Sequence, residues 1–110
     1  IVEQMYDIDY SKAPAVNGNH DRLLSVMERA DRGDKITVAF LGGSITEGSV
    51  ASDDKNCYAY LTYRWWCSTF PDARIQYVNA GIGGTPSLLG VGRCNEDILD
   101  YEPDVVYIEF

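Results

Sequence analysis

The chain has 110 residues, of which 45% are hydrophobic, and this content is sufficient for one compact α/β domain. Nine lysine and arginine residues oppose 17 aspartate and glutamate residues, so the formal net charge of -8 argues against nucleic acid as a partner. No apolar run approaches the roughly 20 residues needed to cross a bilayer and no signal peptide is visible, so we expect no membrane partner.

Residues 1–20 are predicted to form an extended lead-in segment on the surface, because their pattern has no period and is interrupted by proline, asparagine and glycine. We expect this segment to pack on the domain through Tyr6 and Tyr10. A helix is predicted next, with Asn19 as its N-cap and Asp31 as its last residue, since apolar residues recur there at helical spacing.

The rest of the chain alternates apolar strands with helices. The strands are predicted over 36–41, 74–79 and 104–110, and the helices over 58–70 and 88–101. Trp65 and Trp66 are both expected to lie in the core. Helices between consecutive strands imply right-handed crossovers and a parallel, doubly wound α/β structure with its functional residues at the carboxyl ends of the strands.

Two loops, residues 42–49 and 81–87, follow the first and second strands and are rich in glycine and hydroxyl groups. Ser44 comes after two glycines, so its hydroxyl is predicted to project freely at the strand end and to act as a nucleophile. The second loop offers backbone N–H groups that could hold a developing oxyanion, and Gly84 is the expected donor. Each loop by itself is also explained as a tight turn between a strand and a helix.

The two loops together carry a family resemblance. GGSITEG after the first strand and VNAGIGGT after the second resemble the first two signature blocks of the SGNH (GDSL) hydrolases, and PDVVYIEF is similar to the strand before the third block. The resemblance covers residues 36–110. It implies a three-layer flavodoxin-like fold and a serine esterase or acylhydrolase that uses no metal or organic cofactor, with small acyl groups such as acetyl on carbohydrate as substrates.

The resemblance also implies roles for individual residues. Ser44 becomes the nucleophile, and the N–H groups of Gly84 and Ser44 become oxyanion-hole donors, while Gly43, Thr46 and Thr85 are expected to contact the substrate. Gly43 stands where the family name records Asp, and Thr85 stands where many members have Asp. These two departures indicate a sub-branch of the family.

Three further functional residues of the family, an Asn, an Asp and a His, have no counterpart here. The Asn would follow Phe110 directly, so we expect residues 21–110 to be the N-terminal half of a truncated domain and the chain alone to be inactive. Its expected partner is the missing C-terminal half or a second copy. His20, the single histidine, is not expected to be the base, because its helix precedes the first strand and so starts near the opposite rim from Ser44.

Two other functions are also compatible with the sequence. One alternative is a nucleotide-binding α/β domain that uses residues 42–48 to cradle phosphate, although the Lys of the P-loop is missing. Another is a non-catalytic binding module derived from the hydrolase fold. Glu47 and Glu109 lie near the same rim, and we expect them to be solvated or hydrogen-bonded rather than to form an acid and base pair.

The cysteines and the N-terminus are the features of the sequence that bear on the cellular compartment. Cys57, Cys67 and Cys94 form an odd set without a C-x-x-C pair, which fits neither a disulfide framework nor a structural zinc site. The lack of a disulfide framework favours a reducing compartment such as the cytoplasm, and we interpret all three as small buried hydrophobic residues. The chain starts at Ile1 without an initiator Met, so the N-terminus is expected to be processed or incomplete and secretion stays open.

Overall fold

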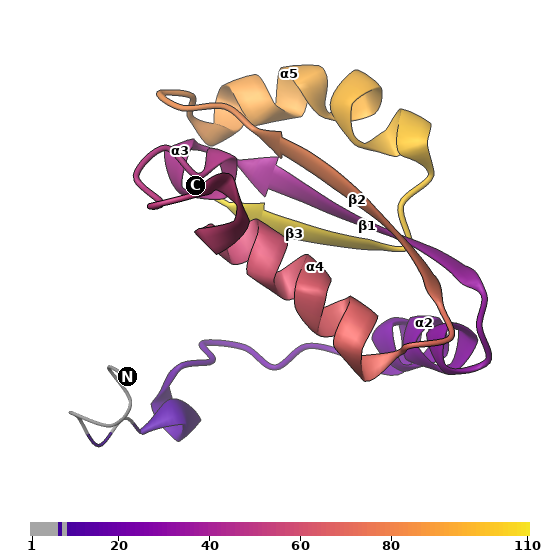
Figure 1. Ribbon diagram of the computed structural model, residues 1–110. Helices are drawn as coiled ribbons and strands as arrows, with labels where there is room; N and C mark the ends of the chain where they lie inside the picture. Colours follow the sequence, from indigo (N-terminus) through magenta and orange to yellow (C-terminus); the bar gives the residue numbers. More distant parts are fainter. Residues whose placement is uncertain (1–6, 8) are drawn as a thin grey trace.

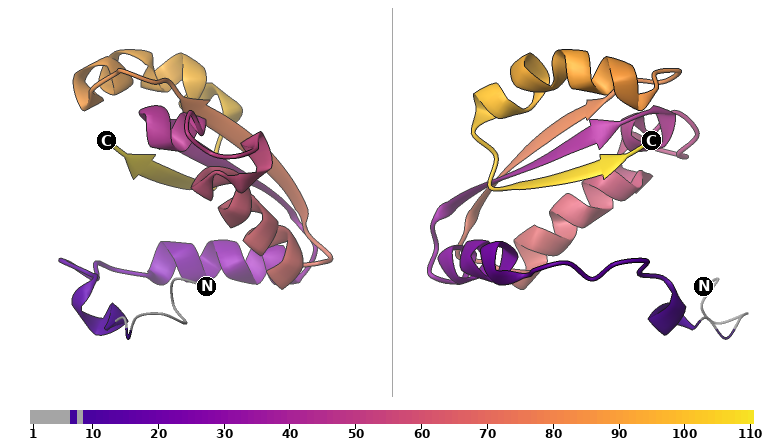
Figure 2. Two further views of the ribbon diagram at one scale, coloured as in Figure 1. Left: turned by 60° about the vertical axis from the view of Figure 1, so that its left-hand side comes forward. Right: turned by 180° about the vertical axis from the view of Figure 1, so that it is seen from behind.

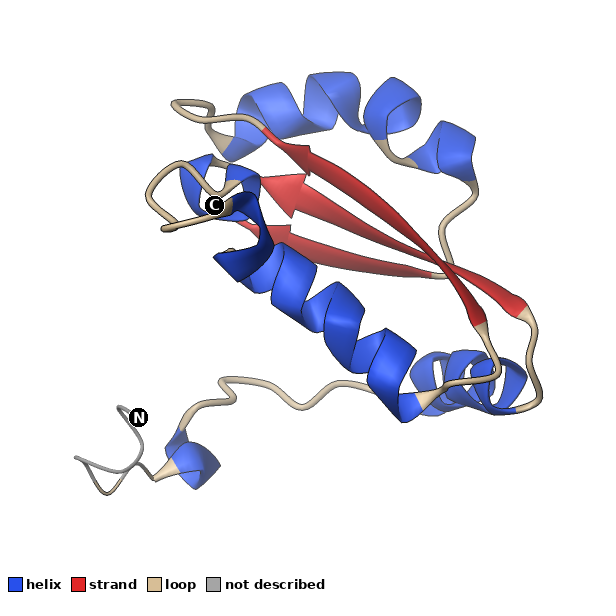
Figure 3. Ribbon diagram, in the orientation of Figure 1, coloured by secondary structure: helices blue, strands red, loops and turns tan. Residues whose placement is uncertain are grey.

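The structure is a computed structural model that describes Asp7 and residues 9–110 (Figure 1). In chain order the elements are η1 (Tyr10–Lys12), α2 (Asp21–Asp31), β1 (Lys35–Gly42), α3 (Ser44–Glu47), η2 (Asp54–Asn56), α4 (Tyr58–Thr69), β2 (Arg74–Gly81), α5 (Ser87–Asp97), η3 (Leu99–Tyr101) and β3 (Val105–Glu109). Figure 3 shows the same elements coloured by type. The helix predicted over 88–101 divides into α5 and η3, because the buried Ile98 leaves helical geometry.

The three strands form one parallel sheet in the order β2-β1-β3. Two connections, through α4 and through α5, return the chain to the amino edge, as parallel pairing requires. The register sets Gly42 of β1 opposite Gly81 of β2 and Glu109 of β3 at the carboxyl edge. The parallel α/β sheet expected from the sequence is therefore confirmed, and the residues that follow β1 and β2 emerge next to each other.

Helices cover both faces of this sheet (Figure 2). One core cluster joins α2 and α4 to one face of β1, and its buried members are Ala30, Ile36, Val38, Phe40, Cys57, Ala59 and Trp66. The second cluster, Ala39, Leu41, Ala80 and Ile98, lies on the opposite face beneath α5 and the turn that follows it. Alternate residues of β1 enter the two clusters, as the two-residue period of a strand dictates. The three-layer arrangement predicted from the sequence is confirmed.

The two adjacent tryptophans of α4 have different environments. Trp66 is fully buried, and its Nε1 donates a hydrogen bond to the Tyr107 hydroxyl at 3.2 Å. Trp65 is 48% exposed, so the expectation that both rings lie in the core is wrong for Trp65. Successive helical residues are rotated by about 100°, and two neighbours cannot both face one sheet.

The segment before the sheet contains a turn that the sequence did not predict. Tyr10–Lys12 form a 3₁₀ turn because the Asp9 carboxylate accepts a hydrogen bond from the Ser11 backbone N–H at 3.1 Å. The predicted contact through Tyr6 lies outside the described residues. Asn19 also caps, since its side chain accepts from the Asp21 backbone N–H at 2.8 Å, although α2 begins one residue later than an Asn19 N-cap requires.

The helix α2 lies at the amino ends of the strands (Figure 2). Arg29 of this helix forms an ion pair with Asp104, which directly precedes β3, and the same carboxylate accepts from the Thr37 backbone N–H at 2.8 Å. His20 stands at the N-cap of α2, with Nε2 2.7 Å from the Asn17 carbonyl oxygen. In the described part of the chain, none of the helices has the length and apolar character that crossing a membrane demands.

Candidate active site

The loops that follow β1 and β2 contact each other at the carboxyl edge of the sheet. The backbone N–H of Ile82 donates to the carbonyl oxygen of Gly42 at 3.1 Å, which joins the bases of the two loops. A Cβ placed on Gly83 would lie 3.6 Å from the Cβ of Ser44, and one placed on Gly43 would lie 3.7 Å from the carbonyl oxygen of Thr85. The Ser44 side chain therefore lies directly beside the backbone of the glycine loop.

Ser44 is exposed and is the first residue of the short helix α3. Its backbone N–H has no acceptor within the helix, because the first turn of any helix leaves its N–H groups without intrahelical partners. The helix ends after one turn, since Gly48 adopts φ 95° and its N–H donates to the Ser44 carbonyl oxygen at 2.9 Å. The Ser44 hydroxyl is thus presented to solvent on a rigid turn.

Two glycines of the second loop are required for different physical reasons. Gly84 has φ 74°, which is unfavourable for residues with a Cβ, but a Cβ there would meet nothing within 4 Å. At Gly81 a Cβ would collide with the backbone nitrogen of Glu47. Gly81 therefore permits close packing of the two loops, and Gly84 permits the turn of the backbone that follows Gly83.

Thr46 is buried beneath this edge. It has 0% exposure, and its hydroxyl donates to Glu109 Oε2 at 3.0 Å and lies 3.0 Å from the Tyr58 hydroxyl. A Cβ on Gly42 would collide with the Thr46 hydroxyl, so the glycine accommodates it. Its hydroxyl thus joins α3 to β3 and α4, and the contact with substrate expected for Thr46 stays a prediction.

Glu47 joins the two loops through its carboxylate. Oε2 accepts a hydrogen bond from the Gly83 backbone N–H at 2.9 Å and another from the Ser49 hydroxyl at 2.8 Å. Glu47 and Glu109 are both hydrogen-bonded, each to its own partners, as one form of the expectation for these two residues predicted. Thr85 is half-buried and its hydroxyl donates to the Ile82 carbonyl oxygen at 2.6 Å, within the glycine loop.

Two residues that the sequence analysis did not single out also hold this edge together. The Asn79 side chain donates to the Thr46 carbonyl oxygen at 2.8 Å and accepts from the Gly81 backbone N–H at 2.9 Å. Arg93 of α5 donates to the carbonyl oxygens of Ala80 at 2.7 Å and Gly42 at 3.2 Å. Asn79 stands inside the VNAGIGGT motif near the end of a strand, and this position could have indicated its role. Nothing in the sequence distinguishes Arg93 from a surface arginine.

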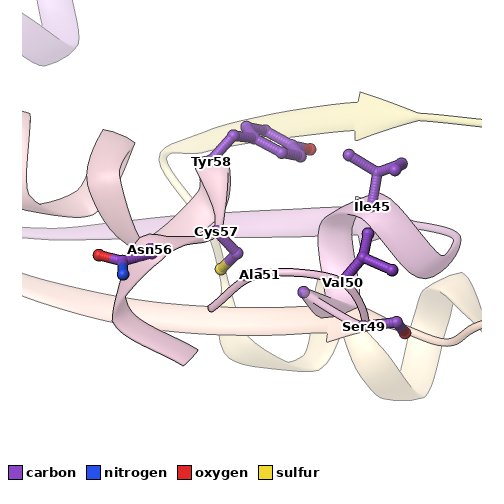
Figure 4. Close-up of a pocket in the computed structure, with 8 residues that line it drawn as sticks. Ile45, Ser49, Val50, Ala51, Asn56, Cys57 and Tyr58 are labelled. Carbon is purple, nitrogen blue, oxygen red and sulfur yellow. The ribbon is translucent and has the colours of Figure 1, made fainter. Parts of the chain in front are cut away.

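A pocket of about 210 Å³ lies beside α3 (Figure 4). It is lined by Ile45, Gly48, Ser49, Val50, Ala51, Asn56, Cys57 and Tyr58. In Figure 4 the side chains of Ile45 and Tyr58 extend toward each other across its upper side. Ile45, which is 53% exposed, is the residue of this largely apolar hollow that directly follows Ser44 in the chain.

The described residues contain no disulfide and no assembled metal site. All three cysteines are free thiols: Cys57 is buried, whereas Cys67 and Cys94 are half-buried, so the interpretation of the three as buried residues holds fully for Cys57 alone. Among the described residues, no cluster of three or more His, Cys, Asp or Glu side chains could hold a metal ion.

Two solved structures are similar to this chain. A two-domain esterase (CEX) active on acetylated mannans, co-crystallised with mannopentaose, superposes with a TM-score of 0.93 and is 52% identical over 96% of this chain. A second structure of a two-domain esterase (CEX) active on acetylated mannans has a TM-score of 0.84 and 54% identity over 86% of this chain. No protein-family model and no curated protein matches. The chain spans only 29% and 25% of the lengths of these two chains, and over that span it shares their fold.

Proposed function

We propose that this chain carries the nucleophile of a serine ester hydrolase of the SGNH type that removes acetyl groups from carbohydrate. The observation that carries the proposal is the contact between the Ser44 turn and the Gly83–Gly84 loop, in a chain more than half identical to esterases active on acetylated mannans. A hydroxyl nucleophile and backbone donors that meet at one sheet edge are the arrangement that acyl transfer requires.

In the proposed reaction the Ser44 oxygen attacks the ester carbonyl carbon, and its proton passes to a general base. The carbonyl oxygen becomes an oxyanion that accepts hydrogen bonds from the N–H groups of Ser44 and Gly84. Collapse of this intermediate breaks the bond to the sugar oxygen, which takes the proton from the base and leaves as the alcohol. Water then hydrolyses the acyl-Ser44 to acetate and free Ser44.

The general base in this proposal is not His20. Its helix α2 lies at the amino ends of the strands, whereas Ser44 lies at the carboxyl edge (Figure 1). His20 is the single histidine of the chain, so the proposal assigns the base to residues of a longer protein. The 110-residue chain alone is accordingly expected to lack enzymatic turnover.

The contacts of Glu47 argue for ester hydrolysis over nucleotide binding. A phosphate cradle at residues 42–48 needs backbone N–H groups that are free to bind the anion, and the N–H groups of Glu47 and Gly48 already donate to the carbonyl oxygens of Gly43 and Ser44 at 3.0 and 2.9 Å. A phosphate in this turn would also lie near the negative carboxylate of Glu47, which belongs to the same turn. A neutral acetyl ester meets no such repulsion in its ground state.

The test is release of acetate from acetylated mannan by the full-length protein that contains this chain. We expect the wild type to release acetate and Ser44→Ala to lose at least about 10³-fold in rate, because the variant has no nucleophile. Ser25→Ala, on an exposed position of α2, is the matched control and should keep the wild-type rate. A wild type that releases no acetate, or a Ser44→Ala variant as fast as the wild type, would contradict the proposal.

A further inference from the structure

The loop that holds the proposed oxyanion donor is fixed by one side chain of the nucleophile turn. Glu47 Oε2 accepts from the Gly83 backbone N–H at 2.9 Å, and Gly83 directly precedes Gly84. The anchored N–H belongs to the peptide unit between Ile82 and Gly83, and the Gly84 N–H is in the next unit along the chain, so the anchor on Gly83 fixes the backbone from which the Gly84 N–H projects. No other side-chain hydrogen bond to the backbone of Gly83 or Gly84 is found among the described residues.

The backbone of Glu47 is held as firmly as its side chain. Its N–H donates to the Gly43 carbonyl oxygen at 3.0 Å, and Gly81 packs against it so closely that a Cβ there would collide with the Glu47 nitrogen. The Ser49 hydroxyl donates to the same carboxylate oxygen at 2.8 Å and fixes its orientation. Glu47 is therefore a rigid link between the turn that presents Ser44 and the loop that contains Gly84.

We propose that Glu47 is a positioning residue for ester hydrolysis, which holds the Gly84 N–H at the place where the oxyanion forms. The inference rests on the proposed function. Glu47 acts through the length of its side chain and its acceptor oxygen, and its negative charge is not required. The charge disfavours an oxyanion nearby, and its engagement by two donors reduces that penalty.

This role predicts a specific order among variants. Glu47→Gln keeps the length and an acceptor oxygen, Glu47→Asp keeps the charge but is one methylene shorter, and Glu47→Ala keeps neither. A displacement of about 1 Å at a catalytic group costs about 100-fold in rate. Glu47→Asp and Glu47→Ala should therefore lose about 10- to 100-fold in both kcat and kcat/KM, since only the transition state uses the oxyanion donor. Glu47→Gln should recover most of that loss.

The experiment measures kcat and KM for 4-nitrophenyl acetate with the full-length protein, its three Glu47 variants, Ser44→Ala and the control Glu28→Ala. Glu28 is an exposed glutamate of α2 at the far end of the sheet, and its replacement should leave kcat at the wild-type value. Thermal unfolding of each variant establishes that it is folded at the assay temperature. If Glu47→Ala does not fold, the comparison of Glu47→Asp with Glu47→Gln decides the question.

Three results would overturn the positioning role: a Glu47→Asp variant with wild-type kcat, a Glu47→Gln variant as slow as Glu47→Ala, or a loss confined to KM. In each of these cases Ser44→Ala still abolishes turnover and the proposed function stands. If Ser44→Ala retains turnover, the proposed function fails, and the role of Glu47 fails with it.

Discussion

The guanidinium of Arg93 donates a hydrogen bond to the Gly42 carbonyl oxygen at 3.2 Å, although the two residues lie 51 positions apart. The same side chain donates to the Ala80 carbonyl oxygen at 2.7 Å and to Asp97 at 3.0 Å. Gly42 precedes the Ser44 turn and Ala80 precedes the glycine loop. One side chain from α5 thus fixes the ends of both strands from which the candidate active site emerges.

Replacement of Arg93 should therefore destabilise the fold. Arg93→Met removes the donors of two backbone carbonyls, and hydrogen bonds to charged groups contribute about 1.5–3 kcal/mol each. Because two bonds from one side chain are not additive, we expect the free energy of unfolding to fall by about 2–4 kcal/mol. Arg93→Lys should also be destabilised, because one ammonium group cannot reproduce a planar fork. Denaturant unfolding measures the change.

The matched control for Arg93 is Arg64→Met, on the exposed side of α4. Surface substitutions of this kind usually change the free energy of unfolding by less than about 0.5 kcal/mol. An Arg93→Met variant no less stable than Arg64→Met would show that the guanidinium does not hold the strand ends.

Thr46 should affect stability more than substrate binding. Thr46→Val keeps the shape of the side chain but leaves the Glu109 carboxylate and the Tyr58 hydroxyl without their partner at 3.0 Å. A buried polar group without a partner costs about 1–3 kcal/mol, so we expect a loss of that size in the free energy of unfolding, with KM close to that of the wild type. Thr46→Ser, which keeps the hydroxyl, should be less destabilised. A raised KM at unchanged stability would instead favour the substrate contact expected from the sequence.

Much of this site follows from the sequence, because strand order and loop position obey general rules. Apolar strands separated by helices predict a parallel sheet, and the carboxyl ends of parallel strands share an edge, so the meeting of the Ser44 and Gly83–Gly84 loops was predictable. The burial of Thr46 was not, since a threonine inside a glycine-rich loop has the pattern of an exposed residue. It depends on how tightly α3 docks on Gly42, which is a property of the folded packing.

The hydrogen bonds of Glu47 and Arg93 could not be predicted from the sequence for the same reason. Their partners are backbone groups 36 and 51 positions away, and any residue provides a backbone N–H or carbonyl. Side-chain identity therefore carries no signal of such a bond. The difference between Trp65 and Trp66 likewise depends on the rotation of α4 about its axis. Because α4 is apolar on most of its sides, the sequence does not determine which side faces the sheet.

The fold should tolerate alanine at position 79 better than aspartate. Its Nδ2 donates to the Thr46 carbonyl oxygen at 2.8 Å and to the Tyr77 hydroxyl at 2.9 Å. Asn79→Ala loses these bonds, whereas Asn79→Asp also sets a negative oxygen against the Thr46 carbonyl. We expect a loss of about 1–2 kcal/mol for alanine and a larger one for aspartate at pH 7. Because a protonated carboxyl group at this position can donate, the gap should narrow near pH 3; equal stability of the two variants at pH 7 would contradict this assignment.

The free energy of unfolding should depend on pH in the alkaline range because of Tyr77. Burial raises the pKa of Tyr77 above its ordinary value of 10.0, because the phenolate is poorly solvated there. The folded state therefore favours the protonated hydroxyl, and this contribution is fully present below about pH 10 and is lost as pH rises through the raised pKa. Tyr77→Phe cannot ionise, so its denaturation midpoint should fall less steeply above pH 10 than that of the wild type. Parallel profiles for the two proteins would contradict the raised pKa.

The most direct test of the account asks which atom of the protein reacts as the nucleophile. The full-length protein is incubated with a fluorophosphonate, which forms a stable bond to an activated serine oxygen, and the modified peptide is identified by mass spectrometry. The account predicts one adduct, on the peptide that contains Ser44, and its loss in Ser44→Ala. An adduct on another serine, or labelling that persists in Ser44→Ala, would contradict the assignment of Ser44 as the nucleophile.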